Sequence, residues 1–282
     1  MKTRYFFLIL LVLPQMVISQ LHLPELEDYN KFLKTKTMVV YDDALLSDFN
    51  LKIKEIVNRS WNITPVEFIT TKEFEKIKDN TDLSFLMTTT VTFQKDKTKA
   101  RYKFLSLLLG QPDTDVRDMP DLCSLPLSYL QVEEESYSYK LEAFILFIQS
   151  HVKSVLSNPE LIGEQGFKQY NKATGGLSNK KLLLVKEELA PDIRDIRKIK
   201  EVYPFEVKLV TREEIAEAIA RQDPEVVFLH KVGPEKTRIR ARVYKLLVGA
   251  GDSKLYYWDY GMIKNASDDA LQASDLKKLA KL

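Results

Sequence analysis

The chain has few of the residues from which disulfides, metal centres and histidine-based active sites are built. Its 282 residues include one cysteine, Cys123, and three histidines. A single cysteine cannot form a disulfide within the chain, and no nucleophile motif surrounds it, so we expect Cys123 to be a buried apolar residue. The histidines His22, His151 and His230 are widely separated and show no zinc-site or triad spacing. The sequence therefore predicts no metal site and no cofactor.

An excess of charge of one sign is also absent. The chain has 42 Lys and Arg residues and 40 Asp and Glu residues. Residues 1–19 hold two of the basic residues and none of the acidic ones, so the remainder carries 40 of each. Nucleic-acid binding and polybasic attachment to a membrane surface both depend on a positive field. We therefore expect no nucleic acid as a partner.

Long apolar runs are absent after the N-terminal segment. Lys2 and Arg4 precede an apolar run from Tyr5 to Leu13 that is too short to cross a bilayer but typical of a signal peptide. We expect residues 1–19 to be removed before Gln20, and a retained membrane anchor is the alternative. The expected product is periplasmic or secreted, soluble, and without a transmembrane span.

The sequence does contain an internal repeat, formed by residues 37–110 and 181–264. Each copy shows the pattern of strand, helix, strand, helix, strand, strand. The first copy begins with TMVVYDD and ends with KTKARYKFLSLLLG, and the second begins with KLLLVKE and ends with KTRIRARVYKLLVGA. We predict an α/β fold made of a duplicated βαβαββ unit, with mixed, mostly parallel sheets and helices on both faces. Two small sheets, or one continuous sheet with pseudo-twofold symmetry, both agree with this pattern.

Three other segments complete the expected organisation. Residues 20–36 form an N-terminal extension, residues 111–180 connect the units, and residues 265–282 end in a helix. The connection contains an apolar helix at 141–156, which polar residues flank and interrupt, so we interpret it as a core element rather than a membrane hairpin. Capping boxes, Thr-x-x-Glu, open the second helix of each unit at Thr70 and Thr211.

Ligands of open α/β sheets bind beyond the carboxyl ends of the parallel strands. In this chain that rule points to Asp42, Asp43, Thr70 and Thr88 in the first unit and to Lys186, Glu187, Thr211 and His230 in the second. We interpret Asp42 and Asp43 as a solvated turn rather than a Mg²⁺ site, because the second unit has no matching pair. His230 is the best single candidate for acid-base catalysis, but we favour the interpretation that it is a half-buried structural histidine.

Two side-chain patterns are candidates for binding. Arg238, Arg240 and Arg242 alternate along an expected strand and could face an anion or an acidic partner, or only keep that strand face soluble. Tyr256, Trp258 and Tyr260 are expected to share one face, either as a stacking surface for a sugar or a partner, or as packing beneath the C-terminal helix.

Several segments, including KTKARYKFLSLLLG, RDMPDLCSLPLSY, SYKLEAFILFIQSHV and LYYWDYGMI, resemble uncharacterised exported proteins of the Bacteroidetes. This resemblance implies a periplasmic or secreted address and says nothing about activity. The order of elements in each unit is also similar to small α/β domains of cell-envelope proteins, such as the N-terminal domain of TolB and the CsgG and LpoB type.

Two hypotheses about function follow. The first is a non-enzymatic cell-envelope protein that binds a protein or a glycan through the arginines, the aromatic residues or the cleft between the units. The alternative is a small-ligand-binding protein or hydrolase-type enzyme with its site at the strand ends near His230.

Overall fold

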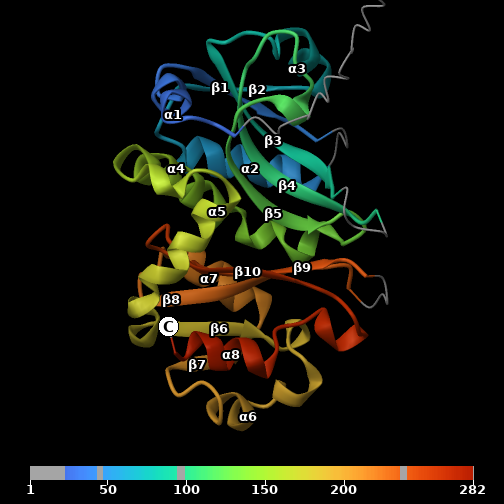
Figure 1. Cartoon of the computed structure of the whole chain (residues 1–282), viewed down its shortest axis with the longest axis vertical. Coiled ribbons are helices and arrows are strands. Elements are labelled where there is room, and N and C mark those ends of the chain that lie inside the picture. The colour runs from blue at the N-terminus through green and yellow to red at the C-terminus, as the bar shows by residue number, and fades with distance from the viewer. Residues whose placement is uncertain (1–22, 43–46, 94–98, 236–239, 282) are drawn as a thin grey trace, which may run out of the picture.

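The computed structural model describes residues 23–42, 47–93, 99–235 and 240–281. Within these ranges the chain forms two five-stranded sheets, one above the other in Figure 1. The first sheet has the order β2-β1-β3-β4-β5, and the second has the order β7-β6-β8-β9-β10. Because the two orders correspond strand by strand, the structure agrees with a duplicated unit and confirms the α/β class. The expected signal peptide lies outside the described residues.

The first sheet is mixed. Its β1 pairs in parallel with β2 and β3, whereas β4 and β5 continue the sheet in antiparallel fashion. Its strands are β1 Lys36–Val40, β2 Val66–Ile69, β3 Leu83–Thr92, β4 Arg101–Leu109 and β5 Asp121–Tyr129. The fifth strand was not predicted: it belongs to the segment expected to connect the units, and its sequence contains a proline, Pro126, which is tolerated because β5 is an edge strand.

The second sheet repeats this arrangement, with β6 parallel to β7 and β8 and with β9 and β10 antiparallel. Its strands are β6 Lys181–Val185, β7 Val207–Val210, β8 Val226–Val232, β9 Arg242–Gly249 and β10 Leu255–Met262.

Helices cover the sheets and fill the space between them. Their bounds are α1 Leu26–Phe32, α2 Asp48–Ser60, α3 Thr71–Ile77, α4 Leu141–Ser157, α5 Gly163–Phe167, α6 Ile196–Lys200, α7 Arg212–Ala220 and α8 Ala273–Leu279. The capping boxes predicted at Thr70 and Thr211 open α3 and α7. No helix in the described ranges combines the length and the apolar character that a bilayer span needs.

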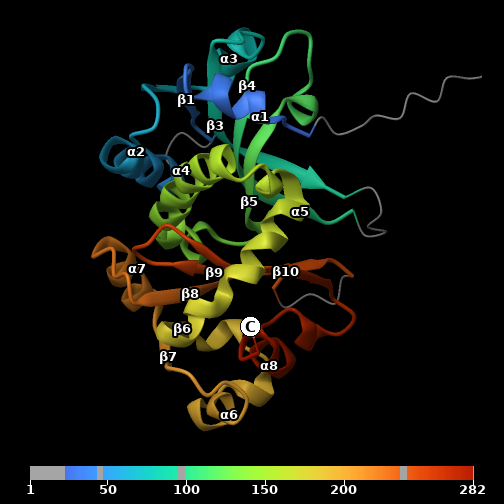
Figure 2. The same cartoon turned by 60° about the vertical axis from the view of Figure 1, so that its left-hand side comes forward.

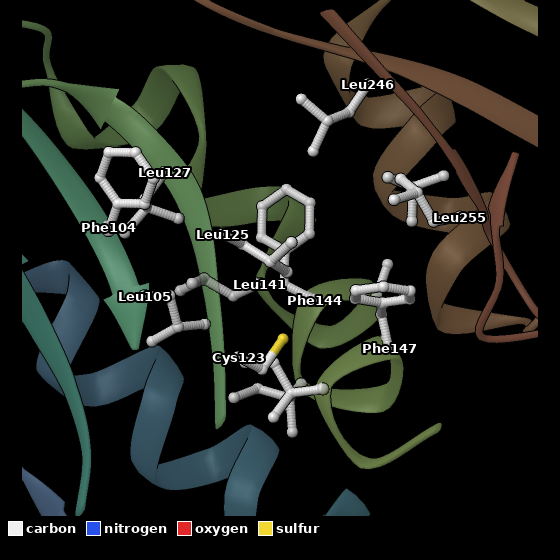
Figure 3. Packing of buried hydrophobic residues seen from close by; sticks show 14 of the residues in the cluster. Phe104, Leu105, Cys123, Leu125, Leu127, Leu141, Phe144, Phe147, Leu246 and Leu255 are labelled. Carbon is white, nitrogen blue, oxygen red and sulfur yellow. The ribbon is translucent and has the colours of Figure 1, made fainter. Parts of the chain in front are cut away.

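The two sheets share one hydrophobic core, and α4 lies at its centre. Phe144 and Phe147 of α4 are each at most 2% exposed. In Figure 3 they lie between Leu125 of the first sheet and Leu246 and Leu255 of the second. The same core includes residues of α1, α2 and α7, so the units form one folded body rather than two domains on a linker.

The two units contribute opposite faces to this core. Phe85-Leu86 of β3 and Phe228-Leu229 of β8 occupy the same place in the repeat, and adjacent residues of a strand point to opposite faces. The shared core contains Leu86 from the first unit but Phe228 from the second. Phe85 packs in a smaller core under α3, and Leu229 packs in another core with α8. A twofold relation would bring together equivalent faces, so the pseudo-twofold alternative is wrong for the described residues.

Hydrogen bonds to the backbone fix the unit boundary. The hydroxyl of Tyr102 on β4 donates to the carbonyl oxygen of Arg242 at 2.9 Å and accepts from its N–H at 2.7 Å. The side chain of Asn171 bonds both the N–H and the carbonyl oxygen of Trp258 on β10, at 2.7 and 2.8 Å. The Tyr102 contacts link the first sheet to the second, and the Asn171 contacts link the connecting segment to the second sheet.

We expect Tyr102→Phe to lower the free energy of unfolding by about 1–3 kcal/mol, because it leaves a backbone donor and acceptor of Arg242 without the hydroxyl between them. Denaturant unfolding measures the change. Tyr260→Phe is the matched control, since the Tyr260 hydroxyl forms no hydrogen bond within the described ranges. Equal stability of the two variants would contradict the role given to the Tyr102 hydroxyl.

Candidate binding site between the units

A small polar hollow lies at the carboxyl ends of β6 and β8, where the second sheet meets the first unit. It has a volume of about 290 Å³, including the part that opens to solvent. In a sheet with the order β7-β6-β8, the gap between β6 and β8 is the switch point at which α/β proteins bind ligands. Figures 1 and 2 both show β5 of the first unit beside β8 and β9. The lining residues are Leu127, Ser128, Tyr129, Val132, Ser136, Tyr137, Glu188, Arg212, Lys231, Val232, Gly233 and Glu235.

One wall of the hollow is a buried ion pair between the units. The ammonium group of Lys140 lies 3.0 Å from Oε1 of Glu188, and the Lys140 side chain is 0% exposed. Burial alone lowers the pKa of Lys140, but the Glu188 carboxylate and the Tyr139 hydroxyl outweigh it and raise the pKa above its usual value. Lys140 therefore stays charged and neutralises Glu188.

Other polar groups of the lining have no protein partner. Oε2 of Glu188 and the hydroxyl of Ser128 are buried and accept or donate no hydrogen bond within the described residues. Ser128 is only 4% exposed. Arg212, the first residue of α7, is partly buried and likewise forms no hydrogen bond or ion pair with a described residue. Because these two oxygen atoms have no accessible surface, the partly exposed guanidinium group of Arg212 is the group of the three that a solute can reach.

A second buried ion pair supports the floor of the hollow. Lys231 lies 2.9 Å from Oδ1 of Asp269, and their side chains are 5% and 3% exposed. Gly233 is needed beside this pair, because a Cβ atom there would lie 2.0 Å from Oδ1 of Asp269. Close packing on Asp269 therefore explains the glycine that follows β8.

The corresponding place in the first unit is filled by the chain itself. The carboxylate of Glu134 accepts from the N–H of Phe49 at 3.1 Å and from the hydroxyl of Ser47 at 3.3 Å, at the start of α2. Asp42 pairs with Lys103 at 3.0 Å. Asp43 lies outside the described residues. Only one of the two strand-end sites therefore retains polar groups without partners, as far as the described residues show.

His230 lies beneath the hollow and does not line it. Its ring is 1% exposed, packs 4.6 Å from the ring of Phe144, and places Nε2 2.9 Å from the carbonyl oxygen of Pro126. Burial lowers the pKa of His230 well below its usual value, and the nearby charge of Lys140 lowers it further. The neutral ring donates to Pro126 and holds β8 against β5. Lys186, Glu187 and Thr211 form no hydrogen bond or ion pair with it.

The structure describes two of the three arginines of the predicted alternating pattern, and it does not place both on the strand. Strand β9 begins at Arg242, so Arg240 precedes the strand, and Arg238 lies outside the described residues. The guanidinium carbon of Arg242 lies 3.5 Å from the ring centre of Phe93 and 5.2 Å from that of Tyr260. Arg242 is thus stacked on aromatic rings at the unit boundary.

The expectation that Tyr256, Trp258 and Tyr260 share a face was wrong. A bulge between Leu255 and Tyr257 shifts the alternation, so Tyr256 packs in the outer core of the second sheet and Trp258 in the shared core. Tyr256 and Trp258 are 6% and 2% exposed, and the Trp258 ring stacks 4.6 Å from that of Phe167. This burial leaves Tyr260 as the partly exposed member of the three.

Three charged residues of the hollow each follow by one residue a position that the strand-end rule indicates: Glu188 follows Glu187, Arg212 follows Thr211, and Lys231 follows His230. The alternation along β8 is one reason: His230 points into the shared core, so its neighbour Lys231 points to the other side. Ser128 could have been predicted as a lining residue of the hollow only if β5 had been predicted as a strand.

The chain matches no known protein-family model, and neither curated proteins nor solved structures provide a match. Function must therefore be argued from the site itself. Among the described residues, no group of three or more His, Cys, Asp or Glu is placed to hold a metal ion.

His230→Asn tests the structural role of this histidine. The lowered pKa makes the folded protein less stable as pH falls through the unfolded-state pKa of about 6.5, because the unfolded chain then binds a proton that the folded chain does not. We expect the loss of unfolding free energy between pH 7 and pH 5 to be about 2 kcal/mol smaller in the variant. The other titrating groups are common to both proteins, so identical pH profiles from denaturant unfolding would refute this assignment.

Proposed function

We propose that this chain is an exported binding protein, without catalytic activity, that holds a small anionic solute in the hollow between its two units. The observation that carries this proposal is Arg212. Its guanidinium group lines the hollow, presents several N–H donors, and has no ion pair among the described residues. A planar guanidinium group binds carboxylates through paired, charge-assisted hydrogen bonds.

The surrounding charges favour an anion at Arg212. The charge of Glu188 is balanced by Lys140, and that of Lys231 by Asp269. Glu235 is exposed at the rim, where water screens its charge. The net attraction inside the hollow is therefore that of Arg212 for a negative group.

The size of the hollow favours a small ligand. Pockets that enclose drug-sized molecules have volumes of about 300–1,000 Å³. Most of the 290 Å³ of the hollow is open to solvent, and its enclosed part has room for about one water molecule, so only a single small charged group of a solute can enter it.

Two observations support binding rather than catalysis. His230 is buried away from the hollow with its ring held by Pro126. Cys123 is also buried, and burial together with the neighbouring Asp121 raises the pKa of its thiol well above the usual value, which disfavours the reactive thiolate. Export is supported by the signal-peptide pattern of residues 1–19 and by the resemblance to exported proteins of the Bacteroidetes.

Arg212→Gln tests the proposed function. We expect the protein to bind small carboxylates, and this variant to bind them about ten- to a hundredfold more weakly, because a charge-assisted hydrogen bond is lost. Titration calorimetry with acetate, propionate, lactate and alanine measures the change. Arg221→Gln is the matched control, since Arg221 lies at the other end of α7, is exposed and pairs with Glu217. Binding that neither variant changes would contradict the proposal, as would the absence of binding by every compound.

A further inference from the structure

The strand at the outer edge of each sheet has backbone groups that no described residue uses. Strand β2 ends the first sheet and β7 ends the second. Figure 1 shows them toward opposite ends of the long axis of the molecule. We propose that copies of this chain associate head to tail, with β2 of one copy paired antiparallel to β7 of the next. This inference is independent of the proposed function.

The pairing of β2 with β1 shows which backbone groups remain unused. The carbonyl oxygens of Pro65 and Ile69 accept hydrogen bonds from N–H groups of the first strand and of the residue after it. Because the direction of these groups alternates along a strand, Val66 and Phe68 turn their N–H and carbonyl groups outward. The outward groups form no hydrogen bond with a described residue, and both residues are partly exposed.

Strand β7 has the same arrangement. The N–H of Leu182 on β6 donates to the carbonyl oxygen of Glu206. By the same alternation Val207 and Leu209 turn their backbone groups outward, and these groups form no hydrogen bond with a described residue. Each copy therefore has two short edges that a strand of another copy can extend.

The charges on the two edges decide which edges pair. Strands Val66–Ile69 and Val207–Val210 occupy the same place in the repeat, and their second residues are the exposed Glu67 and Lys208. Two β2 strands paired antiparallel about this residue would oppose two carboxylates, and two β7 strands would oppose two ammonium groups, both of which are unfavourable. Pairing of β2 with β7 opposes Glu67 to Lys208 and is favoured.

One antiparallel register uses all the outward groups of both edges. With Val66 opposite Leu209 and Phe68 opposite Val207, each pair exchanges both of its N–H···O bonds. The two charged residues then form the non-hydrogen-bonded pair between them, with Cα atoms about 4.5 Å apart and side chains on the same face. The backbone and the charges therefore favour the same register.

Both charged side chains are available for this contact. Lys208 is exposed and forms no hydrogen bond or ion pair with a described residue. Glu67 pairs with Lys36 of β1, but the two side chains are 54% and 46% exposed, and a surface ion pair of this kind contributes little to stability. The carboxylate of Glu67 can therefore turn to Lys208 of a second copy.

Charge reversal tests the pairing in solution. Sedimentation velocity at protein concentrations up to about 1 mM measures the association, which we expect to be weak because the paired edges are short. We expect Glu67→Lys and Lys208→Glu each to weaken it about tenfold, because like charges are then opposed, and the double variant to restore it. Glu160→Lys and Lys277→Glu are the matched controls, since these exposed residues lie outside both strands.

The double variant distinguishes the proposed contact from pairing of like edges. If β2 paired with β2, Lys208→Glu would leave the association unchanged, and the double variant would associate as weakly as Glu67→Lys. If β7 paired with β7, the two single variants would exchange these results. Either pattern overturns the proposal, as does a protein that stays monomeric at every concentration.

Disulfide formation between copies tests the register. The Cα separation of a non-hydrogen-bonded antiparallel pair allows a disulfide, and the native Cys123 is buried. In a mixture of Glu67→Cys and Lys208→Cys proteins under mild oxidation, we expect a linked pair that mass spectrometry assigns to positions 67 and 208. Glu206→Cys, exposed and two positions away on the same face, replaces Lys208→Cys in the control. Equal linkage in the control, or none between positions 67 and 208, would contradict the register.

Discussion

Helix α4 packs against both sheets at once, and the rest of the structure depends on this constraint. Its side chains pack on the first sheet on one side and on the second sheet on the other, so the helix is apolar around most of its circumference. The buried polar residues Glu142, Gln149 and His151 interrupt its apolar surface, and Lys140, immediately before the helix, is buried as well because it reaches across the boundary to Glu188. The same helix that joins the cores therefore also sets a charged group at the edge of the hollow.

The use of opposite faces by the two units explains why the repeat has only one candidate site. With equivalent faces in contact, both switch points would have the same surroundings. In this chain the carboxyl ends of β6 and β8 face β5 and the turn before α4, whereas the matching position in the first unit faces the carboxylate of Glu134. The two sheets are thus similar frameworks, and the packing between them makes their strand ends chemically different.

The regular elements could be predicted from sequence because each depends on local patterns. Apolar runs marked β1 and β6, and the boxes at Thr70 and Thr211 marked the starts of α3 and α7. The same local patterns do not report on contacts between distant residues. The segment that contains Pro126 was not predicted as a strand, because proline is disfavoured in a central strand. The strand order of the folded sheet shows that β5 is an edge strand, where proline is tolerated.

The candidate site was harder to predict from the sequence, because it too depends on contacts between residues that are distant in the chain. Glu188 and Ser128 come from different units, and nothing in the spacing of the chain indicates that they line one hollow. A single bulge in β10 was enough to send Tyr256 and Trp258 to different faces. Whether His230 points into a cavity or into a core likewise depends on Phe144 and Pro126, which are distant in sequence.

The contacts of Pro126 and Asn171 have a further consequence for how the protein behaves among other chains. An edge strand with free N–H and carbonyl groups is a template on which another strand can add. On β5, Pro126 has no N–H to offer, and its carbonyl oxygen already accepts from His230. On β10, the amide of Asn171 occupies both backbone groups of Trp258 as a neighbouring strand would. Strand addition at either of these edges would first have to break contacts that hold the two units together.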